Sequence, residues 1–438
     1  MKWKSKNKLP FVELNSRPQT KTAVIFPEIT EQYLSVSAEA RLAEAAGLAL
    51  AINLDVVYQE VIRLRRVKPA TLIGQGVLER LRPLFTEKGI ELLVVDASLT
   101  PIQQRNLEKF MQIKVIDRTA LILEIFGERA QTSEGKLQVE LAHLSYQRSR
   151  LVRSWTHLER QRGGAGFLGG PGETQIELDR RIIDDKILRI KKDLEKVRQT
   201  RQIQRSARQK VPYPVVALVG YTNAGKSSLF NQLSAGNVLA KDMLFATLDP
   251  ALRKLRLPSG RTVILSDTVG FISDLPHELI MAFRATLEEV LQADIIVHVR
   301  DAANPETKEQ CQDVLKVLES LGLQHIEESK KYIELLNKID LLSADERERL
   351  PKGAGILPIS ALTGEGTDAL LKLLDERLAV GYKVLEFSIP AADGKTIAWI
   401  HANAEVISSR DEDNLMILKV RISHTAASRL KKMLSGSR

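Results

Sequence analysis

The alternation of apolar and polar positions along this chain of 438 residues changes its period several times, and each change marks a candidate domain boundary. Residues 1–20 are polar, contain Pro10 and Pro18, and are predicted to form a flexible leader. In residues 21–128, short β-branched runs such as "ELLVVD" alternate with helical patterns such as "SAEARLAEAAGLAL". This alternation predicts a small α/β domain with a mostly parallel sheet.

Residues 129–210 are dominated by helical spacing and are predicted to form a helical subdomain. Apolar positions in the run that starts at "RTALILEIF" predict one or two helices. The stretch "RGGAGFLGGPGETQ" (162–175) contains six glycines and a proline, so it is predicted to be a loop. From Glu173 to about Lys210 a charged, helix-compatible pattern with an apolar stripe follows. The simplest arrangement is a helical hairpin that brackets a glycine-rich loop.

Residues 211–378 begin with "VPYP", which ends the helical pattern. Strand-like runs then alternate with helical stretches, and this is typical of a doubly wound α/β domain with a parallel sheet. The strand-like runs are "VVALV", "TVILSD", "DIIVHVRD", "KYIELLNKID" and "GILPIS". Residues 379–438 mix strand and helix patterns and predict a small C-terminal α+β domain.

Composition narrows the class of protein. At 44% apolar and 27% charged residues, the chain is predicted to be globular, with several domains. Its single cysteine, Cys311, excludes an internal disulfide framework. No secretory signal and no apolar run long enough for a bilayer are evident. We therefore expect a cytoplasmic location without stable membrane association. A monomer is expected when the protein is free, although nothing in the sequence fixes the oligomeric state.

Positive charge is concentrated in one segment. Between Leu141 and Pro212 there are 17 Lys/Arg against 8 Asp/Glu, an excess equal to the net charge of +9 of the whole chain. Such a concentration suggests a polyanionic partner, with RNA as the first candidate and a membrane surface as the second. A solvated helix face without a partner is the open alternative.

The stretch "VVALVGYTNAGKSSLFNQL" (215–233) matches G-x-x-x-x-G-K-[ST] between a predicted strand and a predicted helix. Main-chain N–H groups in such a loop can cradle phosphates. Lys226 is predicted to neutralise the β and γ phosphates, and the Ser227 hydroxyl to ligate Mg²⁺. The predicted phosphate-loop contacts are Gly220, Tyr221, Thr222, Asn223, Ala224, Gly225, Lys226, Ser227 and Ser228.

A second motif, "NKID", follows a predicted strand and selects the base. At that position Asp340 can accept hydrogen bonds from N1 and N2 of guanine, whereas adenine would leave the carboxylate unpaired. GTP and GDP are therefore the predicted ligands. The predicted base-side residues are Asn337, Lys338, Ile339 and Asp340, with Ser360, Ala361 and Leu362 of "SAL" behind them.

Two further segments are predicted to sense the γ-phosphate. Asp267 of "DTVG" would hold Mg²⁺ through water and the Gly270 N–H would contact the γ-phosphate, while Thr247 of "FATLDP" would be a second Mg²⁺ ligand. The predicted catalytic residues are Lys226, Thr247, Asp267 and Gly270. The predicted nucleotide contacts of these segments are Phe245, Ala246, Thr247, Leu248, Asp249, Asp267, Thr268, Val269 and Gly270.

Phe271 stands directly after "DTVG", where a glutamine could orient the attacking water. Phenylalanine cannot do so, and we therefore expect slow hydrolysis by the free protein. Another residue, a cation or a partner would then position the water. Asn223 is a candidate ligand for K⁺ near the phosphates, and a simple turn-forming asparagine is the open alternative.

The nucleotide motifs, together with "VIDRTALILEIFGERAQTSEGKLQVELAHL" and "RGGAGFLGGPGETQIELDRR", resemble the HflX family of GTPases from about residue 22 to 378. The resemblance implies a two-part N-terminal domain ahead of a Ras-like GTPase domain. It also implies binding to the large ribosomal subunit near the peptidyl transferase centre, in the splitting or rescue of stalled ribosomes under stress. One departure is "GQGVL", where Val77 replaces a lysine that the family often carries.

With this resemblance, the basic glycine-rich segment becomes a candidate rRNA contact, because glycine allows close approach to a backbone. The predicted RNA-binding residues are Arg160, Arg162, Gly163, Gly164, Gly166, Gly169, Gly170, Arg180 and Arg181. The alternative function is a nucleotide-regulated protein that binds or remodels RNA and hydrolyses GTP only incidentally.

Overall fold

The computed structural model describes residues 19–30, 36–161, 171–208, 213–234, 251–273, 289–379, 382–412 and 414–435. The chain divides into two compact units, Met1–Leu121 and Ile122–Arg438. None of the helices in these ranges is long and apolar enough to cross a membrane.

The first unit is built on a four-stranded parallel sheet in the order β2-β1-β3-β4. Apolar residues of α2 and α3 pack on one face of the sheet, and they include Leu81, Phe85 and Leu107. The predicted small α/β domain with a parallel sheet is confirmed. Its elements are β1 (Lys21–Ile29), α1 (Ala38–Ala51), β2 (Asp55–Leu64), α2 (Gln75–Lys88), β3 (Leu92–Val95), α3 (Pro101–Met111) and β4 (Lys114–Asp117).

Local sequence signals explain where the helices of this unit begin and end. Thr100 and Gln103 form a capping box at the start of α3, and Pro101 occupies the first turn. Gly89 ends α2 with φ 65°, a left-handed conformation that glycine adopts without strain. Val77, the departure in "GQGVL", packs against the apolar core of this unit.

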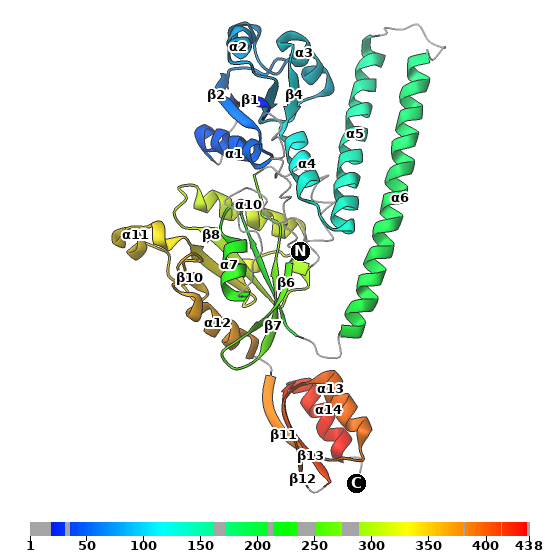
Figure 1. Ribbon diagram of the computed structural model, residues 1–438, viewed down its shortest axis with the longest axis vertical. Coiled ribbons are helices and arrows are strands. Elements are labelled where there is room, and N and C mark those ends of the chain that lie inside the picture. The colour runs from blue at the N-terminus through cyan, green and yellow to red at the C-terminus, as the bar shows by residue number, and fades with distance from the viewer. Residues whose placement is uncertain are drawn as a thin grey trace, which may run out of the picture. The chain divides into compact units, whose positions relative to one another are not determined.

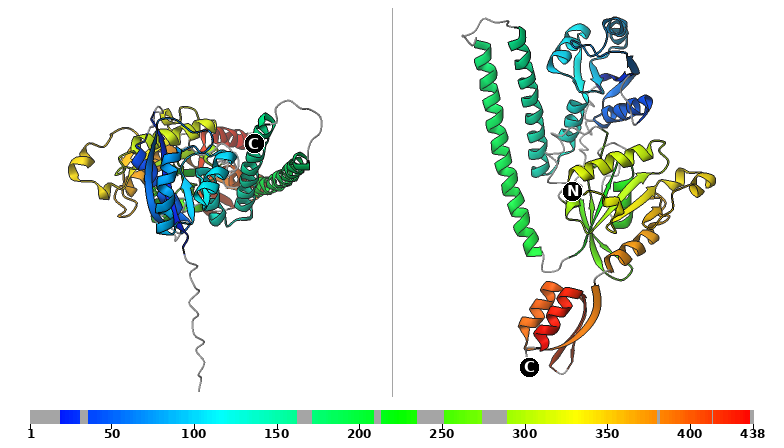
Figure 2. Two further views of the ribbon diagram at one scale, coloured as in Figure 1. Left: turned by 90° about the horizontal axis from the view of Figure 1, so that it is seen from above. Right: turned by 180° about the vertical axis from the view of Figure 1, so that it is seen from behind.

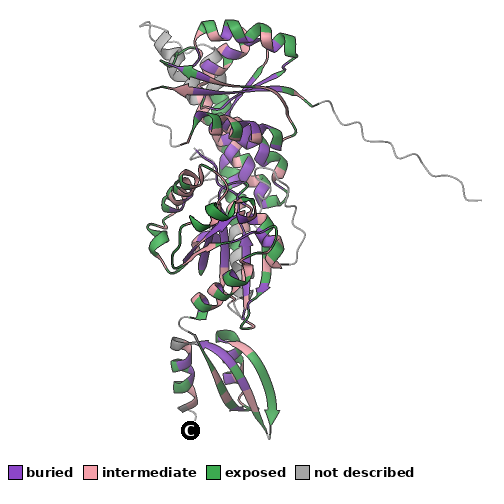
Figure 3. Ribbon diagram, turned by 90° about the vertical axis from the view of Figure 1, so that its left-hand side faces the viewer, coloured by how far each residue is buried: buried purple, intermediate pink, exposed green. Residues whose placement is uncertain are grey.

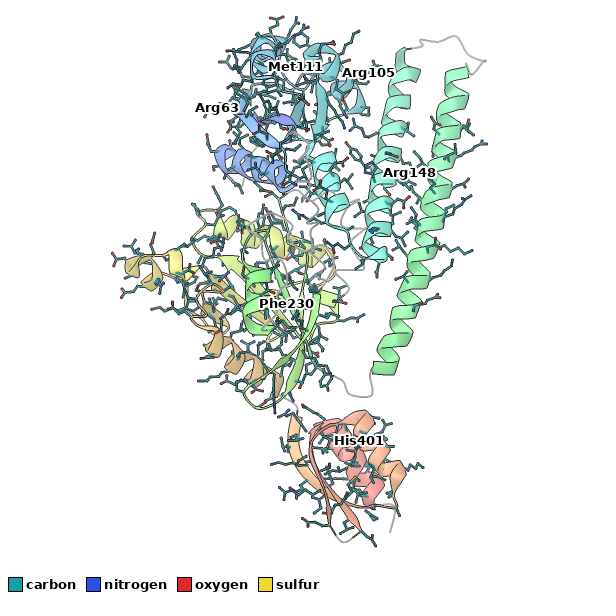
Figure 4. The ribbon with its side chains drawn as sticks, viewed as in Figure 1. Arg63, Arg105, Met111, Arg148, Phe230 and His401 are labelled. Carbon is teal, nitrogen blue, oxygen red and sulfur yellow. The ribbon has the colours of Figure 1, made fainter. Side chains whose placement is uncertain are left out.

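The helical segment consists of α4 (Arg118–Arg129), α5 (Ser133–Gln161) and α6 (Pro171–Arg208). α5 and α6 lie side by side (Figures 1 and 2), joined by a small apolar seam that includes Leu144, Ile187 and Ile190. Arg148 lies between the two helices (Figure 4), with its Nη1 3.2 Å from Asp184 Oδ1. The hairpin therefore forms as the apolar stripe of α6 predicts.

One boundary in this segment was predicted wrongly. The sequence predicted a loop through residue 175, whereas α6 already begins at Pro171. Proline is tolerated in the first turn of a helix, because its missing N–H has no intrahelical acceptor there. The glycine count made the predicted loop too long at its C-terminal end.

A six-stranded sheet in the order β10-β9-β8-β5-β7-β6 forms the centre of the second unit. β6 is antiparallel to β7, and the other pairs are parallel. Its elements are β5 (Val215–Gly220), α7 (Lys226–Ser234), β6 (Ala251–Arg256), β7 (Thr262–Asp267), β8 (Ile295–Asp301), α10 (Thr307–Ser320), β9 (Tyr332–Asn337), α11 (Ala344–Glu348), β10 (Ile356–Pro358) and α12 (Thr367–Ala379).

Helices cover both faces of this sheet. Phe230 of α7 and Leu374 of α12 belong to the apolar cluster on one face, whereas Val314 and Leu318 of α10 belong to the cluster on the other. Buried positions follow the strands (Figure 3), and Phe230 is labelled on α7 in Figure 4. The predicted doubly wound architecture is confirmed.

The C-terminal residues form a small antiparallel sheet in the order β11-β13-β12. Two helices supply Ile400 and Leu430 to a core that also contains Ile389 and Leu418. The predicted α+β fold is confirmed. The elements are β11 (Tyr382–Pro390), α13 (Gly394–Asn403), β12 (Glu405–Glu412), β13 (Leu415–Ser423) and α14 (His424–Ser435).

Candidate nucleotide site

The parallel strands of the central sheet bring four polar segments to one edge. β5 ends at Gly220, β7 at Asp267, β8 at Asp301 and β9 at Asn337. The carboxyl ends of parallel strands share an edge, and open α/β sheets bind ligands there. The topology therefore collects residues that are far apart in the sequence.

Asn337 ties the loop after β5 to the loop after β10. Its Nδ2 donates to Ala224 O at 2.8 Å, and its Oδ1 accepts from Ala361 N at 2.9 Å. Gly225 has φ 92°, and a Cβ there would lie 2.2 Å from Asn337 Nδ2. Only glycine fits this position, since the amide of Asn337 fills the space that a side chain would need.

Lys226 is buried at the start of α7, with 6% of its surface exposed. Its Nζ donates to Tyr221 O at 2.7 Å. Burial lowers the pKa of Lys226 to about 8, although the nearby Asp267 carboxylate opposes the change. A desolvated ammonium group beside a loop of main-chain N–H groups can attract phosphate strongly, because the surrounding dielectric is low.

Two hard oxygen atoms meet next to Lys226. Ser227 Oγ donates to Asp267 Oδ2 at 2.7 Å, and Asp267 is fully buried. Thr268 Oγ1 donates to Leu218 O at 2.6 Å and fixes the chain beyond Asp267. A hydroxyl oxygen and a carboxylate oxygen are among the hard ligands that Mg²⁺ prefers. Within the described ranges, no three His, Cys, Asp or Glu residues cluster into a metal site made of protein groups alone.

Gly270 lies against the phosphate loop. A Cβ on Gly270 would lie 2.9 Å from Thr222 Cα and 3.0 Å from Lys226 Nζ. The next residue, Phe271, is 3% exposed and packs in the apolar cluster that contains Tyr221 and Val290. The ring is therefore held in the core and offers no group that could orient water.

The loops after β9 and β10 hold Asp340 from behind. Ser360 Oγ donates to Asp340 Oδ1 at 2.5 Å, and Thr363 N donates to Ser360 Oγ at 3.1 Å. Lys338 has φ 66°, and its Nζ lies 2.8 Å from Asp301 Oδ2. A carboxylate braced in this way can present its second oxygen to a base with two N–H donors.

The structure brings the predicted phosphate-loop, "DTVG", "NKID" and "SAL" residues to the same edge of the sheet. Asn223 is exposed and has φ 59°, a conformation that asparagine tolerates in turns. The predicted contacts Phe245, Ala246, Thr247, Leu248 and Asp249 lie outside the described residues.

The predicted RNA-binding residues belong to the helical segment. Arg160 is in the last turn of α5, and Arg180 and Arg181 are exposed on α6. Arg181 Nη2 lies 3.2 Å from Glu177 Oε1, and Arg180 Nε lies 3.8 Å from Asp184 Oδ2. The remaining members, Arg162, Gly163, Gly164, Gly166, Gly169 and Gly170, lie outside the described residues.

Sequence reasoning missed two residues of this edge. Asp301, the partner of Lys338, ends the strand "DIIVHVRD", so its position beside Asn337 could have been inferred from the parallel topology. Ser273, whose backbone N and side chain both contact the Tyr221 hydroxyl, had no signal in the sequence.

Four known protein families match consecutive segments that together span most of the chain. Residues 39–127 match the GTP-binding GTPase N-terminal family, and residues 129–208 match the GTP-binding GTPase Middle Region. Residues 215–338 match the 50S ribosome-binding GTPase family, and residues 347–438 match the HflX C-terminal domain.

Among solved structures, a GTP-binding protein from Sulfolobus solfataricus in complex with GDP is 23% identical, with a TM-score of 0.43 over 82% of this chain and 98% of that chain.

The curated relatives are much more similar. The GTPase HflX of Magnetococcus marinus is 50% identical over 89% of this chain and 90% of its own. The GTPase HflX of Escherichia coli is 42% identical over 81% of this chain and 83% of its own. Identity of this extent over most of both chains, together with the family matches, shows that the chain belongs to the HflX family and is a GTP hydrolase.

Proposed function

We propose that this GTPase binds the large ribosomal subunit through its rRNA and hydrolyses GTP to GDP there, in the splitting or rescue of stalled ribosomes under stress. The observation that carries the proposal is the helical hairpin. With 29 residues in α5 and 38 in α6, the helices are about 44 and 57 Å long at ~1.5 Å per residue. Because the apolar seam is small, most of the described surface of α6 is exposed and is available to a ribosomal partner.

The charge of the hairpin supports an RNA partner. α6 alone has 11 Lys/Arg against 7 Asp/Glu, and most of its described residues are exposed. The ion pairs of Arg180 and Arg181 are exposed on one helix, where such pairs contribute little. Phosphates can therefore replace Asp184 and Glu177 as partners at little cost. The family description of residues 215–338 as a 50S ribosome-binding GTPase points the same way.

At the nucleotide site, we assign the phosphates to the loop from Gly220 to Ser228 and to the Lys226 ammonium. Asp340 would accept from guanine while Asn337 and Ser360 keep the loops in place. Ser227 would ligate Mg²⁺, with Asp267 contributing through water and Thr247 as a further ligand. When bound, Mg²⁺ neutralises charge that develops on the phosphates during transfer.

The free enzyme should hydrolyse GTP slowly, because Phe271 is buried in the core and leaves the attacking water without a side-chain partner there. The ribosomal subunit, or K⁺ held near Asn223, would supply the missing positioning. In this scheme the protein is a cytoplasmic monomer that is partly bound to ribosomes. GTP favours the binding-competent state, and docking favours GTP in return, because coupling between two sites is reciprocal.

The decisive experiment measures GTP hydrolysis by the full-length protein, with ATP as a control, alone and with large ribosomal subunits, in potassium and in sodium buffer. We expect slow hydrolysis of GTP alone and strong acceleration by the subunits. Binding to the subunits without acceleration would instead support a nucleotide-regulated RNA-binding protein with incidental hydrolysis.

A charge-reversed pair of variants tests the hairpin. Arg180→Glu with Arg181→Glu should weaken subunit binding and reduce the slope of log affinity against log salt by about 2, roughly one unit per lost phosphate contact. The matched control reverses the charges of Lys330 and Lys331. Both are exposed and directly precede β9, so they lie at the amino edge of the central sheet. An equal change in both variants would mean that net charge alone, and not the hairpin, governs binding.

A further inference from the structure

Tyr221 follows the last residue of β5 and is a member of the phosphate loop, yet its side chain turns into the protein. The residue is 5% exposed and belongs to the apolar cluster beneath α10, with Val219 and Phe271. The phosphate-binding function of the loop rests on main-chain N–H groups and on Lys226, so it does not account for a buried tyrosine at this position.

The Tyr221 hydroxyl makes two contacts with one residue. Ser273 N donates to Tyr221 Oη at 2.8 Å, and Ser273 Oγ lies 2.6 Å from the same oxygen. Both residues are buried, Ser273 to 4% exposure. A phenylalanine would fill the same volume in the core and could make neither bond.

The main chain adds a second link between the same segments. Phe271 N donates to Gly220 O at 3.0 Å, and Thr222 N donates to Phe271 O at 2.7 Å. Tyr221 and Phe271 thus form an isolated parallel β-bridge. The segment from Phe271 to Ser273 is therefore fastened to the phosphate loop by main-chain and side-chain hydrogen bonds together.

This fastening bears directly on Gly270. The three residues Thr268 to Gly270 lie between two fixed points, the Ser227 contact of Asp267 and the bridge at Phe271. Gly270 is already so close to Thr222 and Lys226 that a Cβ would come within 3.0 Å of both. The position of the Gly270 N–H relative to Lys226 therefore depends on both fixed points.

We propose that Tyr221 is a positioning residue that, by holding Ser273 and Phe271 on the phosphate loop, sets the Gly270 N–H at the γ-phosphate and so makes the enzyme distinguish GTP from GDP. The proposal rests on the proposed GTPase function and on the γ-phosphate contact predicted for the Gly270 N–H, and it needs no ribosome. GDP has no γ-phosphate, so loss of the Tyr221 hydroxyl should affect the two nucleotides unequally.

The test compares the affinity of the full-length protein for GDP and for a non-hydrolysable GTP analogue. Tyr221→Phe should lower the affinity for the analogue by about tenfold, which corresponds to roughly one net hydrogen bond. The affinity for GDP should change by less than about twofold. Ser273→Ala keeps the bond from Ser273 N and should produce a smaller loss of about threefold. Combined, the two substitutions should cost no more than Tyr221→Phe alone, because both remove the same contact.

Tyr332→Phe is the matched control. Tyr332 is buried in the same apolar cluster, and its Oη lies 2.6 Å from His298 Nδ1, but it begins β9 and so lies at the opposite edge of the sheet. It should lower the melting temperature as much as Tyr221→Phe does and leave the ratio of the two affinities unchanged. An unchanged ratio of the two affinities in Tyr221→Phe, whether or not both fall, would overturn the proposal. The proposed nucleotide site would still stand in that case if the unmodified protein binds the GTP analogue and GDP with different affinities.

Discussion

At the carboxyl edge of the N-terminal sheet, Arg118 Nη1 lies 2.6 Å from Asp96 Oδ1 and its Nη2 lies 2.6 Å from Glu44 Oε1. Burial opposes the charge of Arg118, but the two carboxylates outweigh it and raise the pKa of the guanidinium. At the same edge of the central sheet, Lys226 has one carboxylate nearby, burial prevails, and the pKa falls to about 8. The pKa values of the two buried cations, each at the carboxyl edge of its sheet, are thus shifted in opposite directions.

This difference in the number of nearby carboxylates distinguishes a cation that stabilises the fold from a cation that is available to bind an anionic ligand. Two carboxylates satisfy Arg118 within the protein, so the cluster stabilises the N-terminal unit and needs no outside anion. Lys226 remains under-compensated, and a polyphosphate would supply the charge that the fold does not. A buried basic residue at the carboxyl edge of a sheet therefore indicates an anion-binding site only when the carboxylates around it are too few to compensate its charge.

The largest expected effect is on stability, in the N-terminal unit. In Arg118→Leu, the half-buried Glu44 would lose this ion pair and the buried Asp96 would keep the longer contact with Arg41, whose Nε lies 3.6 Å from Asp96 Oδ2. The loss of the shared cation should destabilise the unit by about 4 kcal/mol. Urea unfolding of the full-length protein would measure it. Arg63→Leu is the control, because Arg63 is 77% exposed beside Glu28 and should cost about 0.5 kcal/mol or less. Altered GTP affinity in Arg118→Leu would contradict the purely structural role.

For Lys226→Ala, the expected effect is on GTP affinity and not on the stability of the N-terminal unit. With Lys226 as the proposed cation for the phosphates, its removal should lower the affinity for GTP by roughly 100-fold to 1,000-fold, or about 3–4 kcal/mol. The unfolding of the N-terminal unit should not change. Equilibrium titration with a fluorescent GTP analogue would measure the loss. Lys316→Ala on α10, exposed and 3.4 Å from Asp313, should bind GTP normally. Near-native affinity of Lys226→Ala would remove the lysine from the site.

The smallest effect is a dependence on pH, and its sign follows from the pKa of Lys226. Bound phosphates favour the ammonium, so its pKa in the complex is above the value of about 8 in the free protein. The contribution of Lys226 to GTP affinity is then complete below pH 8 and declines above it, by at most about tenfold per pH unit. Lys226→Ala should lose this slope. An equal slope in the variant would assign the titration to another group.

Local sequence was enough to predict which segments meet at the edge of the sheet that holds the candidate nucleotide site. Gly220, Gly225, Lys226 and Ser227 lie within one strand, one turn and one helix, so their relation is set over a few residues of chain. "DTVG" and "NKID" each end a buried strand, and parallel pairing brings such ends to one edge. The error at Pro171 was also local, since glycine content outweighed a residue that is well suited to the first turn of a helix.

The contacts that sequence could not predict join residues distant along the chain. Arg118 and Glu44 are 74 residues apart, and Tyr221 and Ser273 are 52 apart. A pattern of apolar and polar positions records whether a residue favours burial, but it holds no information about which polar group it meets once buried. For this reason the sequence predicted Tyr221 only as a phosphate-loop contact and not as a partner of Ser273.

Periodicity and short motifs act over a few turns of chain, so they were enough to predict the alternation of strands and helices, the phosphate loop and GTP as the ligand. Packing of the folded chain places two carboxylates beside Arg118 and one near Lys226, and it turns the Tyr221 ring into the core, where its hydroxyl contacts Ser273. These contacts are not predictable from local sequence, because the partners of a buried charge or hydroxyl meet only when the sheets and their covering helices pack together.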